Sequence, residues 1–283
     1  MAKTHGLSIN RMEKELTTLT GQKQAGVSDR PTAIVTGGRR GIGQAIAYAL
    51  ASRGFNIVLN DIIDDRVAHA TTEGLKKLGV RSLFVPGDIS RLDRHEFILD
   101  RALETFGSLD CLVNNAGIQV RNRGDVLDVT PERFDEMMGT NLRGVFFLTQ
   151  AFARRVLALN SSPAAPRSII TITSSNAVMA SVEKSEYCIS KSALSMASTL
   201  FAVRLAGSGI RVFEVRPGLI RTEMTASVRE KYGVEIERGL SPIARWGEPE
   251  EVAEAVASLA TGSIPFSTGA VINIDGGLQI QRL

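Results

Sequence analysis

Short apolar runs alternate with helix-length amphipathic segments from residue 31 to the end of the chain. The apolar runs are rich in Val and Ile and are bounded by Gly, Pro or Asp, which is typical of buried strands. The predicted strands are Ala33–Thr36, Asn56–Asn60, Ser82–Pro86, Cys111–Val113, Ile169–Thr173, Arg211–Val215 and Ala270–Ile274.

This rhythm is typical of βαβ units, in which helices connect parallel strands. It predicts an α/β fold at residues 30–283: a single domain built on a Rossmann-like, doubly wound parallel sheet of about seven strands. Its ligand crevice is expected at the carboxyl ends of the strands. Residues 1–29 are polar and are predicted to form a mobile N-terminal extension, with a short helix around Arg11–Leu19. A surface loop is expected at 161–166.

Composition narrows the function classes. The net charge is +3, of which residues 1–30 supply +2, and no clustered basic face is indicated, which argues against nucleic-acid binding. Two cysteines cannot form a disulfide framework, so a reducing, cytoplasmic setting is expected. The three histidines lack metal-ligand spacing and lie far from the motifs described below, so no metal site is expected. No apolar stretch is long enough to span a bilayer, so no membrane association is expected.

A glycine-rich turn follows the first predicted strand and precedes a predicted helix. Its glycines permit a tight turn and close approach of the backbone to a pyrophosphate, and the helix N-terminus offers free N–H groups to the phosphates. A glycine-rich turn can also be purely structural, but its place between the first strand and a helix favours dinucleotide binding. The candidate cofactor residues here are Gly37, Arg39, Arg40, Gly41, Ile42 and Gly43.

The spacing Thr-Gly-x-x-x-Gly-x-Gly resembles that of the short-chain dehydrogenase/reductase family. Three more segments match the motifs of this family in its order: Asp88-Ile89, Asn114-Asn115-Ala116-Gly117 and Pro217-Gly218-Leu219-Ile220-Arg221-Thr222. The resemblance implies that these segments contact adenine, the nicotinamide ribose and the carboxamide. The residues it implicates are Asp88, Ile89, Asn115, Ala116, Gly117, Pro217, Gly218, Ile220 and Thr222.

Two residues point to opposite cofactors. Asp61 ends the second predicted strand, where its carboxylate can accept hydrogen bonds from the adenosine ribose and repel a 2′-phosphate, which favours NAD. Arg40 stands where a basic residue often accompanies NADPH in the family, although it could equally serve the pyrophosphate. Because Asp61 would meet the phosphate directly, NAD is the predicted cofactor and NADP the alternative.

Tyr187 and Lys191 are four residues apart, so on a helix they share one face. Ser174 precedes Tyr187 by thirteen residues, and Asn141 lies in a predicted helix after the fourth strand. Together they resemble the family's Asn, Ser, Tyr and Lys set. Ser175 competes with Ser174, but the thirteen-residue interval selects Ser174.

Interconverting a ketone and an alcohol requires a group that exchanges a proton with the reacting oxygen. A phenol does this near neutral pH only if its pKa falls by roughly 2–3 units. We expect Lys191 and a positive nicotinamide to lower the pKa of Tyr187. The resemblance implies that Lys191 also holds the nicotinamide ribose, that Ser174 binds the substrate oxygen, and that Asn141 seats a relay water.

The sequence says less about the substrate than about the cofactor. The chain resembles 3-oxoacyl-carrier-protein reductases, yet Ser208 stands where an arginine would dock the acidic carrier protein. Ala-Gly-Ile-Gln resembles sugar-acid dehydrogenases, and polar residues flank the motifs. These are Gln119, Arg121, Asn176, Glu183 and Lys184, which are either pocket residues or ordinary solvated ones. A small polar sugar, polyol or hydroxy acid is the predicted substrate, and a 3-oxoacyl thioester is the alternative.

Three further expectations concern the whole chain. Family members usually form tetramers, and Val145–Val156 and Ser192–Leu205 are apolar enough for burial on two sides, so a homotetramer is predicted. The segment Glu223–Leu240 is expected to be a mobile lid over the pocket. A scaffold that kept the fold and lost catalysis is a remote alternative, disfavoured because Tyr187 and Lys191 are both present.

Overall fold

The computed structural model describes residues 30–159 and 163–282, so the predictions for residues 1–29 and for the first part of the 161–166 loop lie outside it. Seven parallel strands form one sheet in the order β3-β2-β1-β4-β5-β6-β7. Their bounds are β1 Thr32–Thr36, β2 Asn56–Asp61, β3 Ser82–Pro86, β4 Cys111–Asn114, β5 Ser168–Ile172, β6 Arg211–Pro217 and β7 Val271–Ile274. The predicted fold class is confirmed, and each strand begins and ends within two residues of its predicted bounds.

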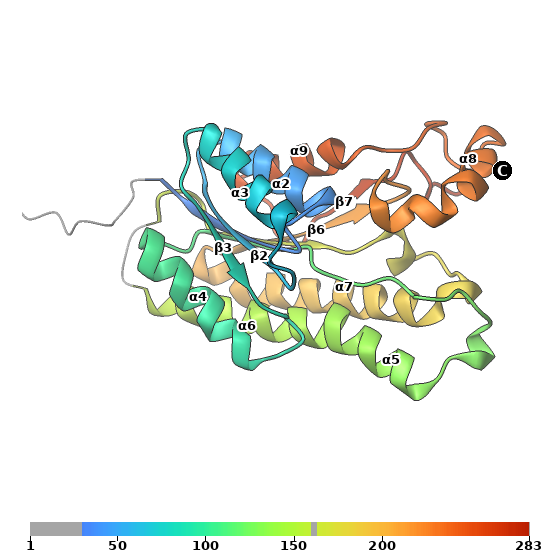
Figure 1. Ribbon diagram of the computed structural model, residues 1–283, viewed down its shortest axis with the longest axis horizontal. Helices are drawn as coiled ribbons and strands as arrows, with labels where there is room; N and C mark the ends of the chain where they lie inside the picture. The colour runs from blue at the N-terminus through green and yellow to red at the C-terminus, as the bar shows by residue number, and fades with distance from the viewer. Residues whose placement is uncertain (1–29, 160–162, 283) are drawn as a thin grey trace, which may run out of the picture.

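Helices cover both faces of the sheet (Figure 1). One layer holds α2 (Gly41–Ser52), α3 (Arg66–Lys77) and α9 (Pro249–Ala260), and the other holds α4 (Asp93–Phe106), α6 (Val145–Ala158) and α7 (Ser185–Leu205). Two shorter helices, α5 (Pro131–Met138) and α8 (Arg229–Glu237), lie beyond the carboxyl ends of the strands. No helix in the described part of the chain has the length and apolarity that a membrane crossing requires.

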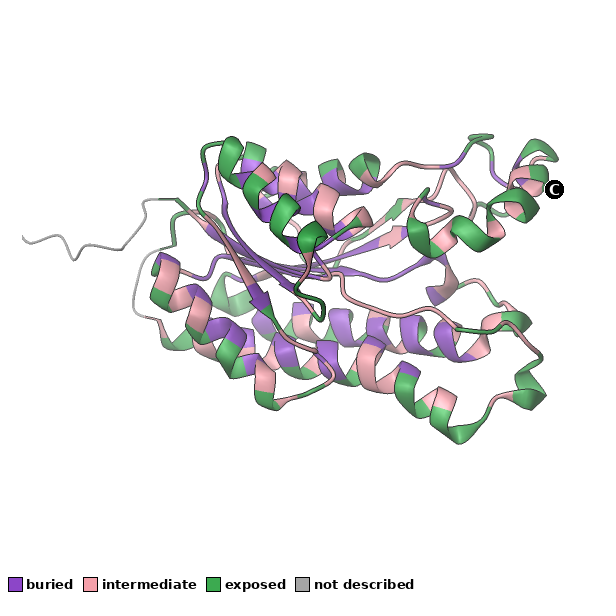
Figure 2. Cartoon of the chain, viewed as in Figure 1, coloured by how far each residue is buried: buried purple, intermediate pink, exposed green. Residues whose placement is uncertain are grey.

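The alternating faces of the strands build two separate hydrophobic cores. In β1, Ala33 and Val35 face α2 and α9, whereas Ile34 faces the layer of α4 and α6. β1, β2 and β5 are buried along almost their whole length, as Figure 2 shows for the centre of the sheet. Full burial of one such aliphatic side chain contributes about 1.5–3 kcal/mol, so these continuous Val/Ile runs fix the strands in place.

The strand order reverses between β1 and its two neighbours. From β1 the chain moves outward to β2 and β3, and β4 then starts on the other side of β1. The loops that leave β1 and β4 therefore diverge, which opens a crevice at the carboxyl ends of the strands. The glycine-rich turn, Asp61, Asp88, the Asn-Asn-Ala-Gly motif, Ser174 and the Pro-Gly turn all lie at or just after strand ends, whereas Asn141, Tyr187 and Lys191 lie on helical segments.

Candidate active site

A cleft of about 1450 Å³ opens at this edge of the sheet. It is lined by every predicted cofactor residue and by Ser174, Tyr187 and Lys191 of the predicted catalytic set. Asn141 is the exception, because it is fully buried beneath the cleft. The topology thus brings together motifs that are spread over residues 37 to 222 of the chain.

The glycine-rich turn has the geometry of a phosphate cradle. Gly37 and Gly41 adopt φ angles of 62° and 58°, a conformation that side-chain-bearing residues rarely take. A Cβ on Gly43 would lie 2.1 Å from the carbonyl oxygen of Gly37, so α2 could not pack this closely on the turn with any other residue. The N-terminus of α2 has no side-chain cap and no acidic residue in its first turn. Its N–H groups and positive dipole end therefore suit the pyrophosphate of a dinucleotide.

The Asn-Asn-Ala-Gly motif locks this turn onto β4. The Asn115 side chain donates to the carbonyl oxygens of Thr36 and Gly37 at 2.9 and 3.1 Å, and the Thr36 hydroxyl accepts from the N–H groups of Asn115 and Ala116. The Asn115 side chain thus holds the phosphate turn, while the motif as a whole lines the cleft. Sequence reasoning missed Thr36 as the partner that joins the two motifs.

At the adenosine end, Asp61 and Arg40 face different surroundings. The Asp61 carboxylate accepts from the N–H groups of Arg39 and Ile62, which fixes its orientation at the cleft wall. Arg40 forms an ion pair with Glu223. The Arg39 guanidinium pairs with Asp65 at 2.6 Å, so its side chain is already engaged by the protein.

The expectation that all histidines lie far from the motifs is wrong for His95. Its ring is buried, and Nε2 lies 2.7 Å from the carbonyl oxygen of Ile89, in the predicted adenine-binding segment. Burial lowers the pKa of His95, so the neutral ring supports this turn from behind. No group of three potential metal ligands occurs among the residues that the structure describes.

The catalytic set meets where β5 ends against α7. Ser174 lies close enough to Tyr187 for its side chain to act on the pKa of the phenol. Lys191 lies one helical turn after Tyr187, with Nζ 5.7 Å from the phenol ring centroid, and donates to the carbonyl oxygen of Ile172 at 3.1 Å. The fold thus brings Ser174, Tyr187 and Lys191 to one part of the cleft.

Asn141 sits in a π-helical turn, Gly139–Gly144, between α5 and α6. Its side chain accepts from the N–H of Ile118 at 2.8 Å and donates to the Ile118 carbonyl at 2.9 Å and to the Ser190 hydroxyl at 3.2 Å. Single π-helical turns are frequent at functional sites because they re-aim one side chain. Here the turn ties the segment after Asn-Asn-Ala-Gly to α7, one residue before Lys191.

Burial acts against both ionisable catalytic groups. It raises the pKa of Tyr187 to about 12, although the Ser174 side chain opposes this, and it lowers the pKa of Lys191 to about 8, although Glu214 opposes that. The expectation that the phenol pKa is lowered is therefore wrong for the groups of this chain alone. Lowering it needs a further positive charge beside the ring, and the charge on an oxidised nicotinamide has the required sign.

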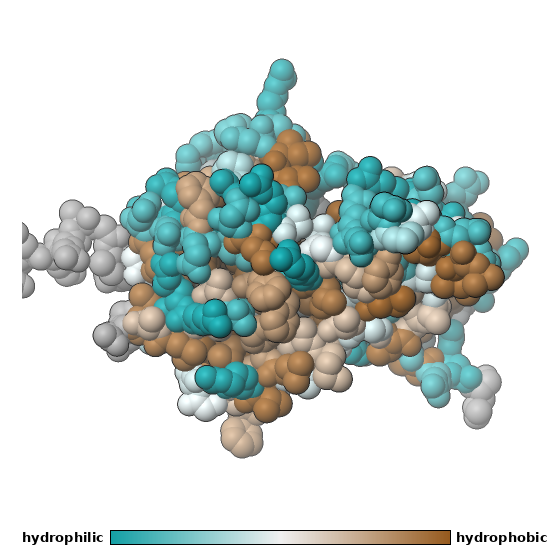
Figure 3. Space-filling model, turned by 90° about the horizontal axis from the view of Figure 1, so that it is seen from below, coloured by the Kyte–Doolittle hydropathy of each residue, from teal (hydrophilic) through white to brown (hydrophobic). Residues whose placement is uncertain are grey.

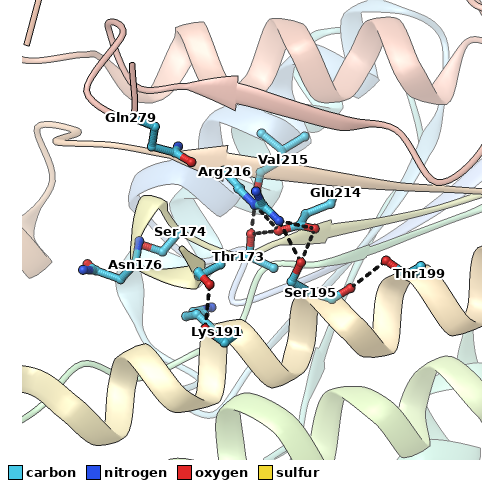
Figure 4. A network of polar contacts seen from close by, with 12 residues as sticks. Thr173, Ser174, Asn176, Lys191, Ser195, Thr199, Glu214, Val215, Arg216 and Gln279 are labelled. Atoms are coloured by element: carbon cyan, nitrogen blue, oxygen red, sulfur yellow. Dashed lines mark hydrogen bonds and ion pairs between the residues drawn. The ribbon is translucent and has the colours of Figure 1, made fainter. Parts of the chain in front are cut away.

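A buried ion pair lies behind these residues and was not foreseen from the sequence. Glu214 on β6 accepts from Thr173 at 2.5 Å, from Ser195 at 2.7 Å and from Arg216 at 2.6 Å. Figure 4 shows that the network joins β5, β6 and α7 next to Ser174 and Lys191. The available signal was the pair of charges at 214 and 216, two apart in an apolar strand and hence on one face.

The Pro-Gly turn at the end of β6 closes the part of the cleft that the family resemblance assigns to the nicotinamide. A Cβ on Gly218 would lie 2.7 Å from Asp275 Cα, so glycine is required for this turn to pack. Thr225 donates to the Ile220 carbonyl at 2.8 Å and accepts from the Thr222 N–H at 3.1 Å, which starts the 3₁₀ helix Glu223–Val228. Ile220 and Thr222 both line the cleft.

Four of the five polar residues predicted to flank the substrate line the cleft, and one does not. Gln119, Arg121, Asn176 and Lys184 line the cleft, whereas Glu183 does not. Glu183 instead forms ion pairs with Arg123 and with Lys231 of α8. The predicted lid therefore consists of a 3₁₀ helix and α8, and it is tied to the opposite rim of the cleft; its mobility stays a prediction.

Comparison with known proteins gives a consistent result. A family model described as "Enoyl-(Acyl carrier protein) reductase" matches residues 37–279. The chain is 32% identical to a 3-oxoacyl-[acyl-carrier-protein] reductase of Staphylococcus epidermidis, over 88% of this chain and 99% of that protein.

Two solved structures are also similar. A 3-oxoacyl-[acyl-carrier protein] reductase of Brucella melitensis in complex with NAD has a TM-score of 0.87 and 48% identity, covering 90% of this chain and 99% of that one. A structure from Agrobacterium tumefaciens, provisionally named a 2-deoxy-D-gluconate 3-dehydrogenase and holding NADP, has a TM-score of 0.79 and 30% identity, covering 89% and 97%. With its phosphate cradle, its Ser174–Tyr187 pair and these matches across the whole sheet, the chain belongs to the short-chain dehydrogenase/reductase family.

Proposed function

We propose that this oxidoreductase interconverts a secondary alcohol and a ketone in a small polar sugar, polyol or hydroxy acid, with a preference for NAD(H). The observation that carries the proposal is that Ser174, Tyr187 and Lys191 lie together in the cleft that is also lined by the glycine-rich turn, with Lys191 Nζ 5.7 Å from the ring centroid of Tyr187. A dinucleotide bound there supplies or accepts the hydride.

The residues of the chain would handle the proton and the substrate oxygen. Ser174 and Tyr187 would both hydrogen-bond that oxygen, and Tyr187 would give it a proton on ketone reduction or take one on alcohol oxidation. Lys191, held by the Ile172 carbonyl, would favour the phenolate through its charge and bind the nicotinamide ribose. Asn141 would seat a relay water through the segment that it positions.

The proposed preference for NAD(H) rests on the adenosine end. Asp61 presents an oriented carboxylate to the cleft, and a 2′-phosphate beside it would be repelled. Arg40 is paired with Glu223 and Arg39 with Asp65, so neither cation is free to bind that phosphate without giving up its partner. The Brucella structure that is 48% identical is a complex with NAD.

A 3-oxoacyl-thioester reductase is the second candidate, favoured by the names of the relatives. The structure places Ser208 on the surface, in a 3₁₀ helix before β6. A serine offers an acidic carrier protein no charge at the position where the family resemblance puts an arginine.

We also propose that the enzyme works as a homotetramer in the cytoplasm. Every proposed site residue lies between residues 37 and 222, so the extension formed by residues 1–29 would be dispensable for turnover.

The test is a substrate panel assayed by nicotinamide absorbance with NAD(H) and with NADP(H). We expect turnover of polyols, sugars or hydroxy acids to exceed that of acetoacetyl thioesters, and Tyr187→Phe to abolish turnover while NADH still binds. Strong acetoacetyl-thioester reduction without polyol, sugar or hydroxy-acid oxidation would select the second candidate. Unchanged activity of Tyr187→Phe would disprove the mechanism.

A further inference from the structure

Lys184 places a positive charge next to the catalytic phenol. It ends the 3₁₀ helix Val182–Lys184, directly before α7, and its half-buried side chain lines the cleft. Its Nζ lies 5.8 Å from the ring centroid of Tyr187. A substrate whose oxygen meets the Tyr187 hydroxyl would therefore have its neighbouring carbons within reach of this ammonium.

The other cations of this rim already have anionic partners. Arg121 pairs with Glu136, and Glu183 pairs with both Arg123 and Lys231. Within the described part of the chain, the Lys184 ammonium has neither a hydrogen bond nor an ion pair, and it lies over the ring of Tyr187.

Burial makes the charged form of Lys184 costly. It is the largest influence on the pKa of this ammonium and lowers it, and Arg123 adds to the lowering, whereas Tyr232, Cys188 and Glu183 act in the opposite direction. An anion bound beside the ammonium would stabilise its charged form further. The arrangement is thus more costly in the free enzyme than in a complex with a negatively charged substrate.

The geometry points to Lys184 as the binding group for a substrate carboxylate located a few bonds from the reacting carbon. The inference rests on the proposed function and narrows it from small polar alcohols to hydroxy acids, sugar acids and their keto counterparts. A single ammonium matches a monoanionic carboxylate, whereas a phosphate ester would call for additional donors. The phosphate of a carrier-protein arm is too many bonds away from its thioester to reach a group this close to Tyr187.

The experiment compares acids with neutral partners of the same shape. The substrates are 3-hydroxybutyrate with its methyl ester, and gluconate with sorbitol, oxidised by wild type, Lys184→Met and Lys76→Met. Lys76 is a matched control because its exposed ammonium pairs with Glu73 on α3 and does not line the cleft. We expect Lys184→Met to lower kcat/KM for the acids about 30-fold, mainly through KM, and for the neutral partners less than about threefold.

The Lys76→Met control should stay within about threefold of wild type on every substrate. Equal losses on acids and neutral partners in Lys184→Met, or no loss, would overturn the carboxylate assignment. So would a wild type that oxidises sorbitol but neither acid, and in that case the proposed polar-alcohol function would survive. A wild type that reduces acetoacetyl thioesters alone would remove the proposed function itself.

A second test measures ligand binding to the wild-type protein, so it depends neither on turnover nor on the folding of a variant. The NADH fluorescence of the wild-type complex is titrated with butyrate and with butyramide, which differ in charge but hardly in shape. We expect butyrate to bind at least about tenfold more tightly, because only the anion gains the Lys184 contact. Equal affinity of the two ligands would contradict the assignment.

Discussion

The Lys191 ammonium is buried, and a charge is costly in such a place. Burial lowers its pKa from 10.5 to about 8, so between these values the unfolded chain binds a proton that the folded chain does not. Stability therefore rises with pH across this window, and the cost of burying the charged form is fully present below about pH 8. The proposed role of the ammonium beside Tyr187 would account for a charge in so costly a place.

This gives a prediction for Lys191→Met, which removes the titrating group and keeps the length of the side chain. The unfolding free energy of wild type minus that of the variant should increase by about 2 kcal/mol between about pH 7.5 and pH 9.5. Urea unfolding at the two pH values measures it. Cys111, whose pKa burial raises to about 12, cancels because it is present in both proteins. A difference that does not change with pH would show that Lys191 is not titrating in this window.

Asp61 offers a second test at a single residue. Its carboxylate would accept hydrogen bonds from the adenosine ribose and repel a 2′-phosphate, so Asp61→Ala should weaken NAD(H) and relieve NADP(H). We expect the ratio of kcat/KM for NAD(H) over NADP(H) to fall by about tenfold or more. Steady-state kinetics with both cofactors measure the ratio. A wild type that already prefers NADPH would mean that Arg40 leaves Glu223 to bind the phosphate.

At the scale of the elements, the positions of the strands were predictable because buried parallel strands consist of continuous runs rich in Val and Ile. The motif residues were predictable because a parallel sheet gathers its strand ends at one edge. The Glu214–Arg216 pair was not predictable, since its partners Thr173 and Ser195 come from β5 and α7 and only the folded sheet brings them together. The π-helical turn around Asn141 was not predictable either, because the spacing of hydrophobic residues does not distinguish it from an α-helix.

The Glu214–Arg216 pair also fixes the carboxyl ends of β5 and β6 relative to each other. Glu214 is 2% exposed and accepts from residues on β5, β6 and α7, all adjacent to the catalytic set. Glu214→Ala would leave Arg216 largely buried without its anion, and we expect a loss of about 3–5 kcal/mol in unfolding free energy. The double variant Glu214→Ala/Arg216→Ala should lose less than the single one.

Chemical denaturation measures both variants of this pair. Glu254→Ala is the control, because the Arg53–Glu254 ion pair between α2 and α9 is solvent-exposed and should be worth less than about 1 kcal/mol. If the double variant is less stable than Glu214→Ala alone, the single loss does not come from an unpaired Arg216.

For the whole molecule, one surface lacks the polar cover of the rest. The outer faces of α6 and α7 expose large apolar side chains: Phe147, Leu157, Ile189, Met196, Leu200 and Val203. Figure 3, which looks onto the lower side of the molecule in Figure 1, shows hydrophobic side chains gathered across its middle, below a hydrophilic region. Contiguous apolar surface of this kind is typical of a protein interface, and both helices are those predicted to be buried on two sides.

The proposed homotetramer can be tested on this face. Leu200 is 58% exposed on α7, and Leu200→Glu would place a charge on both sides of an isologous interface formed by these helices. We expect the variant to lose the tetramer in light scattering at micromolar concentration, with far-UV circular dichroism unchanged. Leu127→Glu is the matched control, because Leu127 is 90% exposed in the 3₁₀ helix Val126–Asp128, away from α6 and α7. A monomeric wild type would refute the tetramer, and a tetrameric Leu200→Glu would place its interface elsewhere on the molecule.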